Sequence, residues 1–192
     1  NIPVAHTMSG KGAIPCTHYL NAGLFGRYDR IANEIILNSD CILVIGCKLG
    51  EIATKRYTLP HLTQTVIHIE LVPEEFDRTF KPNLRLWADA REALKDLYRE
   101  IRKYTSEITH KNANYASSIS KSMTKWRDGV HKRLTSIEKP IDMARLMNEL
   151  NETLPDNAIL IADGGFAAHW GGLLYDTKKA GRTFIPDRGF AS

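Results

Sequence analysis

The chain has 192 residues, of which 43% are hydrophobic and 25% charged, and its formal net charge is +4. This composition is typical of a globular protein of one or two domains, and no apolar run is long enough for a membrane-spanning helix. The excess positive charge lies in residues 105–139, where seven Lys and Arg accompany three Asp and Glu. Because no nucleic-acid recognition motif accompanies this segment, we interpret it as a solvated helical face and do not expect nucleic-acid binding.

Three cysteines, Cys16, Cys41 and Cys47, are too few for a disulfide framework and are predicted to be buried free thiols. The sequence begins at Asn1 without a basic and apolar leader, so no signal peptide is predicted. Both observations favour a cytoplasmic location.

The first predicted elements are a short strand at residues 2–8 and a glycine loop after it, Ser9-Gly10-Lys11-Gly12. This loop is similar to a phosphate cradle, but the Walker spacing is missing, so a plain glycine turn is favoured. Residues 21–28 are predicted to form a second glycine loop. Asp29 then caps a helix whose apolar stripe includes Ile31 and Ile35.

Residues 41–45 are uniformly apolar and are followed by Gly46, which predicts a strand covered on both faces. The elements predicted after it are a strand at 65–71, a short helix at 73–76, a strand at 84–87 and a helix at 90–104 capped by Asp89. This alternation predicts an α/β fold with a doubly wound, mostly parallel sheet.

Apolar residues spaced by three and four from 115 to 137 predict a long amphipathic helix that packs as a connector and is interrupted only at Gly129. The elements predicted after Pro140 are a helix capped by Asp142, a strand at 158–162, a turn at 163–165, a helix at 166–175 and a strand at 183–185.

The predicted domains are a central α/β domain at residues 1–104, incomplete at its N-terminus, a helical linker at 105–139, and a truncated second α/β unit at 140–192. Because that last unit is too small to bury a core of its own, we expect the chain to be an internal segment of a longer polypeptide.

Several stretches together resemble the thiamine-diphosphate enzymes of the acetolactate synthase type. IPVAHTMSGKGAIP (2–15), TVIHIELVP (65–73) and ADAREAL (88–94) are similar to the central domain of that family. AILIADGGFAAHW (158–170) and GRTFIPDRGFAS (181–192) resemble the start of its C-terminal, diphosphate-binding domain. The order of these stretches along the chain is the order in the family.

Members of the family join or cleave carbon–carbon bonds next to a carbonyl, with thiamine diphosphate and Mg²⁺ as cofactors. The resemblance therefore implies a 2-oxo acid substrate and a homodimer or homotetramer. The family's activating Glu and its Mg²⁺-binding motif have no counterpart in this chain. We therefore assign no catalytic and no metal-binding residue, and we expect the segment alone to be inactive.

By this resemblance, two stretches would face thiamine diphosphate. The diphosphate turn matches Gly164, Gly165, Phe166, Ala167, Ala168 and His169, and a loop beside the aminopyrimidine matches Gly189, Phe190, Ala191 and Ser192. Acetolactate synthases often have Gln-His at Phe166-Ala167, so only backbone contacts are expected there, and His169 is expected to face a neighbouring strand. From the spacing alone, a purely structural turn is the alternative.

The family's central domain carries FAD, ADP or no nucleotide. The positions that match its nucleotide-binding residues are Gly23, Gly26, Gly46, Lys48, Glu70 and Asp89. The Arg-Phe-Asp-Asp run that clamps the flavin is replaced by Lys48-Leu49-Gly50-Glu51, so FAD is not expected and the purified protein should be colourless. His68 is interpreted as a packed histidine and not as a metal ligand.

Two other functions fit parts of the sequence. One is a non-catalytic module that binds a nucleotide such as ADP, FAD or coenzyme A. The other is an NAD-dependent deacylase of the sirtuin type, although the Gly-Ala-Gly and His-Gly loops of that class are missing. Binding of thiamine diphosphate with Mg²⁺ would distinguish a thiamine-diphosphate enzyme from these alternatives.

Overall fold

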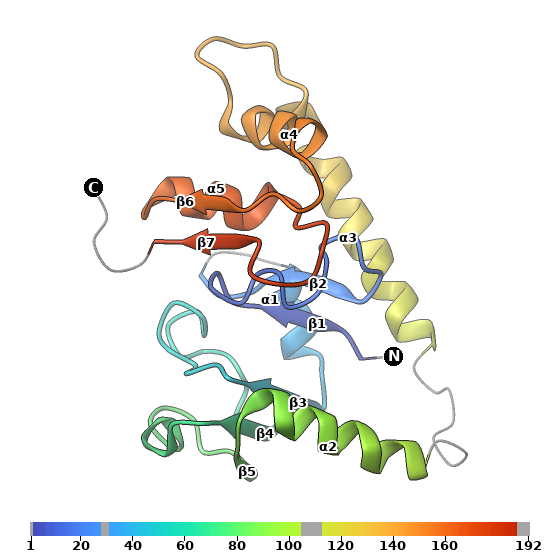
Figure 1. Ribbon diagram of the computed structural model, residues 1–192, viewed down its shortest axis with the longest axis vertical. Helices are drawn as coiled ribbons and strands as arrows, with labels where there is room; N and C mark the ends of the chain where they lie inside the picture. The colour runs from blue at the N-terminus through green and yellow to red at the C-terminus, as the bar shows by residue number, and fades with distance from the viewer. Residues whose placement is uncertain (1, 28–30, 105–112, 188–192) are drawn as a thin grey trace. The chain divides into compact units, whose positions relative to one another are not determined.

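The computed structural model describes residues 2–27, 31–104 and 113–187, and the side chains from residue 115 onward in the last range (Figure 1). The predicted α/β class is confirmed, and all strand pairs in these ranges are parallel. The strands are β1 (Val4–His6), β2 (Asn21–Leu24), β3 (Cys41–Ile45), β4 (Thr65–Glu70), β5 (Leu84–Trp87), β6 (Leu160–Ala162) and β7 (Phe184–Pro186). They form three small sheets, β1-β2, β3-β4-β5 and β6-β7.

The helices are α1 (Ile31–Leu37), η1 (a 3-10 turn, Pro73–Glu75), α2 (Ala90–Lys103), α3 (Ala113–Leu134), α4 (Met143–Thr153) and α5 (Phe166–Leu174). Two of the three predicted caps are confirmed. The Asp89 carboxylate accepts hydrogen bonds from the amides of Arg91 and Glu92, and the Asp142 carboxylate accepts one from the Ala144 amide. None of the helices in the described residues is long and apolar enough to cross a membrane.

The chain divides into two compact units, Asn1–Phe25 with Asn112–Ser192, and Gly26–Lys111. The first 25 residues therefore pack with the C-terminal half of the chain, whereas the predicted division places them with residues 26–104. We call the two the split unit and the middle unit.

In the middle unit, β3 and β4 pair in register from Cys41 opposite Thr65 to Ile45 opposite Ile69. A small core of Val44, Leu49 and Val66 lies beside this pair. The prediction that β3 is covered on both faces is wrong at its two ends, since Cys41 is exposed and Ile45 is 37% exposed. The apolar run correctly predicts the strand because it is short and bounded by polar residues and Gly46, but it does not fix how much of the strand its neighbours cover.

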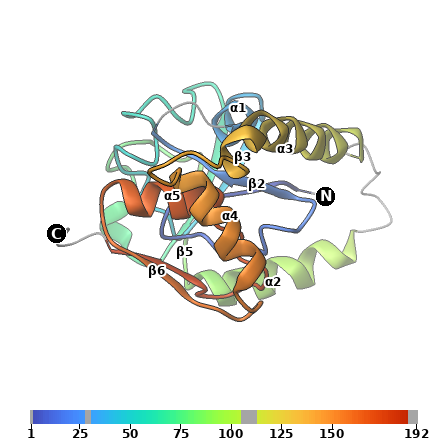
Figure 2. The same ribbon diagram turned by 90° about the horizontal axis from the view of Figure 1, so that it is seen from above.

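In the split unit, α5 is the central element, because it contacts β2, β6, β7 and α4 (Figures 1 and 2). Two glycines permit this close packing. A Cβ atom on Gly171 would lie 2.9 Å from the Phe184 ring, and one on Gly172 would lie 2.1 Å from the Met8 sulfur. The main core of the chain forms here, around Met8, Leu24, Met147, Leu174 and Phe184.

Two predictions of secondary structure are wrong in this unit. Residues 21–24 form strand β2 instead of a loop, because they pair with β1 and bury Ala22, with a register shift between Val4 and Ala5. Helix α3 is continuous through Gly129, since no neighbour forces a break there. The predicted core stripe of α3 is confirmed, with Ile119 buried and Trp126 packed on the main core. Asp29 lies outside the described residues.

Candidate functional site

The predicted diphosphate turn connects β6 to α5. Gly165 caps α5 with φ 68° and ψ −137°, and the Asp163 carboxylate accepts a hydrogen bond of 2.7 Å from the Gly164 amide. A Cβ atom built on Gly165 would meet no atom within 4 Å. The turn therefore combines a backbone conformation that favours glycine with open space above it.

The start of α5 offers hydrogen-bond donors to this open space. The first amides of a helix have no acceptor within the helix, and the helix dipole places partial positive charge at the same end. Phe166 is 78% exposed, Ala167 is also exposed, and the first turn of α5 contains no acidic side chain. This arrangement is suited to an anionic group such as a diphosphate.

The predicted residues of this stretch do not all face the same way. Gly165, Phe166 and Ala167 are exposed, whereas Ala168 is 3% exposed and belongs to the main core. Only the backbone of Ala168 is therefore available to a ligand. His169 is half-buried. Gly189, Phe190, Ala191 and Ser192 lie outside the described residues, and the cofactor-facing role of both stretches stays a prediction.

Three of the predicted nucleotide residues lie at one edge of the middle unit. Gly46 directly follows β3, and Glu70 is the last residue of the neighbouring strand β4. The Gly46 amide donates a hydrogen bond of 2.9 Å to the Ile69 carbonyl. Asp89 lies just beyond the end of β5. The Glu70 carboxylate accepts hydrogen bonds from the amides of Leu71 and Val72 through one oxygen. The carboxyl ends of parallel strands are where open α/β sheets bind ligands.

The other three predicted nucleotide residues have structural partners. The Lys48 ammonium lies 3.0 Å from the Glu75 carboxylate, and the hydrogen bond from Lys48, with a second from Arg78, lowers the pKa of Glu75. The Asn33 side chain accepts a hydrogen bond from the Gly26 amide and donates one to the Gly26 carbonyl, both of 2.8 Å. Gly23 lies in β2 of the split unit, next to Met123. A nucleotide phosphate would have to compete with Glu75 for Lys48, and this set of six also stays a prediction.

Comparison with known proteins agrees with the predicted resemblance. Residues 1–97 match the central domain of the thiamine pyrophosphate enzymes. This chain belongs to the thiamine pyrophosphate enzyme family. The whole chain is 26% identical to a probable acetolactate synthase large subunit of Methanocaldococcus jannaschii and covers 32% of that protein. Over 95% of its length it is 22% identical to the acetolactate synthase isozyme 3 large subunit of Escherichia coli K12, of which it covers 31%.

Over 49% of its length, the chain is 31% identical to a glyoxylate carboligase of Escherichia coli O157:H7 and covers 16% of that protein. The acetolactate synthase relatives confirm that this member of the thiamine pyrophosphate enzyme family resembles the acetolactate synthase type. The chain spans about a third of the length of the acetolactate synthases that it matches.

In the Gly-Lys-Gly loop of this family member, the lysine does not offer its charge to solvent. The Lys11 ammonium is buried and donates a hydrogen bond of 2.9 Å to the Gly172 carbonyl, so it faces the protein interior. Burial also lowers the pKa of Lys11. Sequence reasoning missed Arg182, which lies beside this loop in space; the only signal was a basic residue after Gly181 and before a strand.

The remaining candidate side chains have structural roles. His68 is 2% exposed, its Nε2 atom lies 3.1 Å from the Cys47 carbonyl oxygen, and burial lowers its pKa. Within the described ranges, no group of three His, Cys, Asp or Glu residues is placed to hold a metal ion. The three cysteines are free thiols as predicted, but Cys41 is exposed and the other two are only partly buried, so the predicted burial is wrong for Cys41 and incomplete for Cys16 and Cys47.

We predict that His6 makes the split unit sensitive to acid. Burial and the nearby Lys11 charge lower the pKa of His6 from 6.5 to about 4. As the pH falls below 6.5, the unfolded chain binds a proton that the folded chain does not bind until about pH 4. The contribution of neutral His6 to the free energy of unfolding is therefore present above pH 6.5 and is lost on acidification, by about 2.5 kcal/mol at pH 4.5.

Urea unfolding at pH 7.5 and 4.5 checks this prediction. The decrease in the free energy of unfolding from pH 7.5 to pH 4.5 should be smaller by about 2.5 kcal/mol in His6→Gln than in the wild type. His61→Gln, a change at an exposed histidine, should leave the wild-type loss unchanged. An equal loss in His6→Gln and the wild type would contradict the prediction.

Proposed function

We propose that this chain is part of a thiamine-diphosphate-dependent enzyme that joins or cleaves carbon–carbon bonds next to the carbonyl of a 2-oxo acid. The family match supports the use of thiamine diphosphate, and the acetolactate synthase relatives support the reaction class of a transferase or lyase. The observation that carries the proposal within this chain is the open turn at Gly165, followed by the exposed start of α5.

The residues of this turn fit the diphosphate of the cofactor. Gly165 leaves space for phosphate oxygens, and the amides of Phe166 and Ala167 would donate hydrogen bonds to them. When bound, the cofactor would supply the nucleophilic carbon and the electron sink of the reaction. The start of α5 would hold and orient the anionic end of the cofactor, and Mg²⁺ is the proposed counter-ion of the diphosphate.

The parent enzyme is proposed to be cytoplasmic and to assemble as a homodimer or homotetramer. The non-catalytic nucleotide module is not favoured, because the relatives across the whole chain are named as acetolactate synthases. FAD is not proposed, because Lys48 is already paired with Glu75 and the Arg-Phe-Asp-Asp run is absent.

Calorimetric titration of the complete protein that contains this chain tests the proposal. Thiamine diphosphate should bind in the presence of MgCl₂, the saturated protein should consume pyruvate or another 2-oxo acid, and the purified protein should show no flavin absorbance. Retention of ADP or coenzyme A together with no binding of thiamine diphosphate would overturn the proposal in favour of the nucleotide module. Binding of thiamine diphosphate without turnover of any 2-oxo acid would overturn the proposed reaction.

A further inference from the structure

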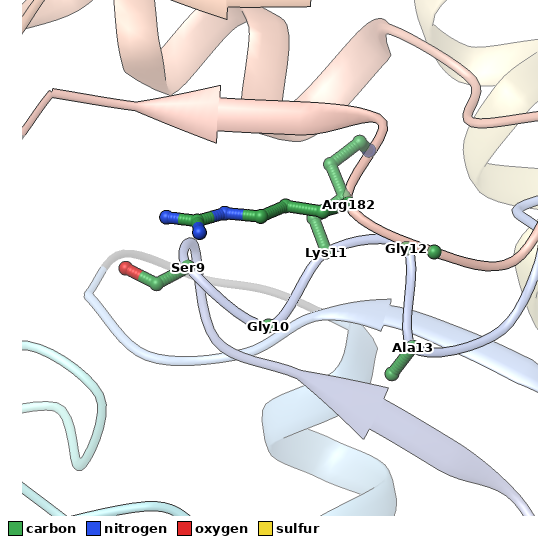
Figure 3. Close-up of a pocket in the computed structure, with 7 residues that line it drawn as sticks. Ser9, Gly10, Lys11, Gly12, Ala13 and Arg182 are labelled. Carbon is green, nitrogen blue, oxygen red and sulfur yellow. The ribbon is translucent and has the colours of Figure 1, made fainter. Parts of the chain in front are cut away.

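A second glycine-containing loop of the split unit borders a cavity. Ser9, Gly10, Lys11, Gly12 and Ala13 line it together with Gly181 and Arg182, and its volume is about 430 Å³ (Figure 3). None of the seven lining residues is acidic. The cavity is largely open to solvent, its volume lies within the range of small-ligand sites, and no acidic side chain lines it.

The cavity is held together by backbone contacts between two distant segments. The Gly181 amide donates a hydrogen bond of 2.9 Å to the Gly12 carbonyl. Behind the loop, the Lys11 side chain leaves the cavity toward α5, where its ammonium reaches the Gly172 carbonyl (Figure 3). Lys11 thus anchors the loop to α5, and its ammonium points away from a ligand in the cavity.

Arg182 supplies the cation of this cavity. Its side chain is exposed and extends along the loop, with the guanidinium on the side of Ser9 (Figure 3). Among the described residues, no carboxylate forms an ion pair with Arg182. A guanidinium carries several donors in a planar fork that matches the oxygens of phosphate.

Further donors around the cavity lack acceptors. The backbone amides of Gly12 and Arg182 have no hydrogen-bond acceptor among the described residues. The buried Thr183 hydroxyl has no partner there either, and it lies 3.4 Å from the position that a Cβ of Gly12 would take. Thr183 does not line the cavity, but a ligand with several acceptor oxygens would accept hydrogen bonds from the amides of Gly12 and Arg182.

We propose that this cavity binds a phosphate group, held by the Arg182 guanidinium, the amides of the glycine loop and the Ser9 hydroxyl. The site is distinct from the thiamine diphosphate turn. Because β6 and β7 are parallel, Arg182 lies before the start of β7, at one end of this strand pair, and Gly165 follows β6 at the other end. The proposal does not depend on the proposed thiamine chemistry.

Calorimetric titration of the complete protein, saturated with thiamine diphosphate and Mg²⁺, tests this site with inorganic phosphate, ADP and acetate as probes. Phosphate should bind saturably, and Arg182→Gln should weaken the binding roughly 10- to 100-fold, as expected for loss of charge-assisted hydrogen bonds. Lys179→Gln is the matched control: it removes a charge from a nearby exposed residue and should change the affinity less than about twofold.

The probes also identify the source of the phosphate group. Tighter binding of ADP than of phosphate, lost in Arg182→Gln, supports a nucleotide, and equal affinities support a free phosphate or a simple monoester. Equal phosphate affinity in Arg182→Gln and the wild type overturns the proposal, as does the absence of saturable phosphate binding or equal affinity for acetate. Arg182→Gln should leave thiamine diphosphate binding unchanged, and a loss of that binding would show that the two sites are one.

Discussion

Gly12→Ala should destabilise the protein by about 3–5 kcal/mol, a large effect for the addition of one methyl group. The added Cβ would lie 2.3 Å from the Gly181 carbonyl oxygen, a backbone atom that cannot move aside as a flexible side chain can. Gly12 also has φ +96°, where a residue with a Cβ is strained. The substitution would therefore separate the loop at residues 9–13 from residues 181–183 and break their hydrogen bond.

Urea unfolding monitored by circular dichroism measures this loss, and two other glycines serve as controls. Gly50 lies in a loop with open space around it, so Gly50→Ala should change the free energy of unfolding by less than about 0.5 kcal/mol. Gly129 lies inside α3 and also meets no neighbour, so Gly129→Ala should stabilise by about 0.5–1 kcal/mol. A loss below about 1 kcal/mol in Gly12→Ala would contradict the close approach of the two segments.

Local sequence signals were sufficient for most elements of this fold. The strand β5 and the start of α2 were predicted at their observed positions, because short apolar runs and an Asp cap are local signals. The cap at Asp142 was found for the same reason. In each case, the residues that decide the structure lie within a few positions of each other.

The errors arise where a distant segment decides the structure. Asn21-Ala22-Gly23-Leu24 has the composition of a turn, and it becomes β2 only because β1 supplies the partner strand. Similarly, Gly129 alone predicts a weak point in a helix, whereas α3, which packs on α4 and β2, runs through it without a break. Neither contact can be inferred from one segment by itself.

Of the two candidate sites, one is defined by residues that are neighbours in the sequence and the other by a contact between distant segments. The turn at Gly164 and Gly165 was found because a buried strand, two glycines and a helix follow each other directly in the sequence. The cavity at Ser9–Ala13 was not, because it depends on Arg182, which the contact between Gly12 and Gly181 places beside the loop. From the sequence, a phosphate cradle is the less favoured interpretation of the Gly-Lys-Gly loop; the fold buries the Lys11 ammonium against Gly172 and leaves Arg182 in the cavity wall.

Gly165→Ala should weaken thiamine diphosphate binding about 10- to 100-fold while the protein stays folded. The new methyl group would meet no protein atom within 4 Å, so it would occupy the open space that the proposed function gives to the phosphate oxygens. Displacement of the diphosphate from the first amides of α5 removes charge-assisted hydrogen bonds, each contributing about 1.5–3 kcal/mol. The fold itself should lose only the strain at φ 68°, about 1–3 kcal/mol.

Gly46→Ala provides the matched control, because Gly46 also has a positive φ, at 55°, and also meets no atom within 4 Å. Both substitutions place a Cβ at a positive φ, but Gly46 belongs to the middle unit and is not part of the proposed diphosphate turn. Titration of each folded variant of the complete protein with thiamine diphosphate and Mg²⁺ should show weaker binding only in Gly165→Ala. If both variants bind as the wild type does, the start of α5 does not hold the diphosphate. If both bind equally weakly, general strain and not the open space at Gly165 explains the loss.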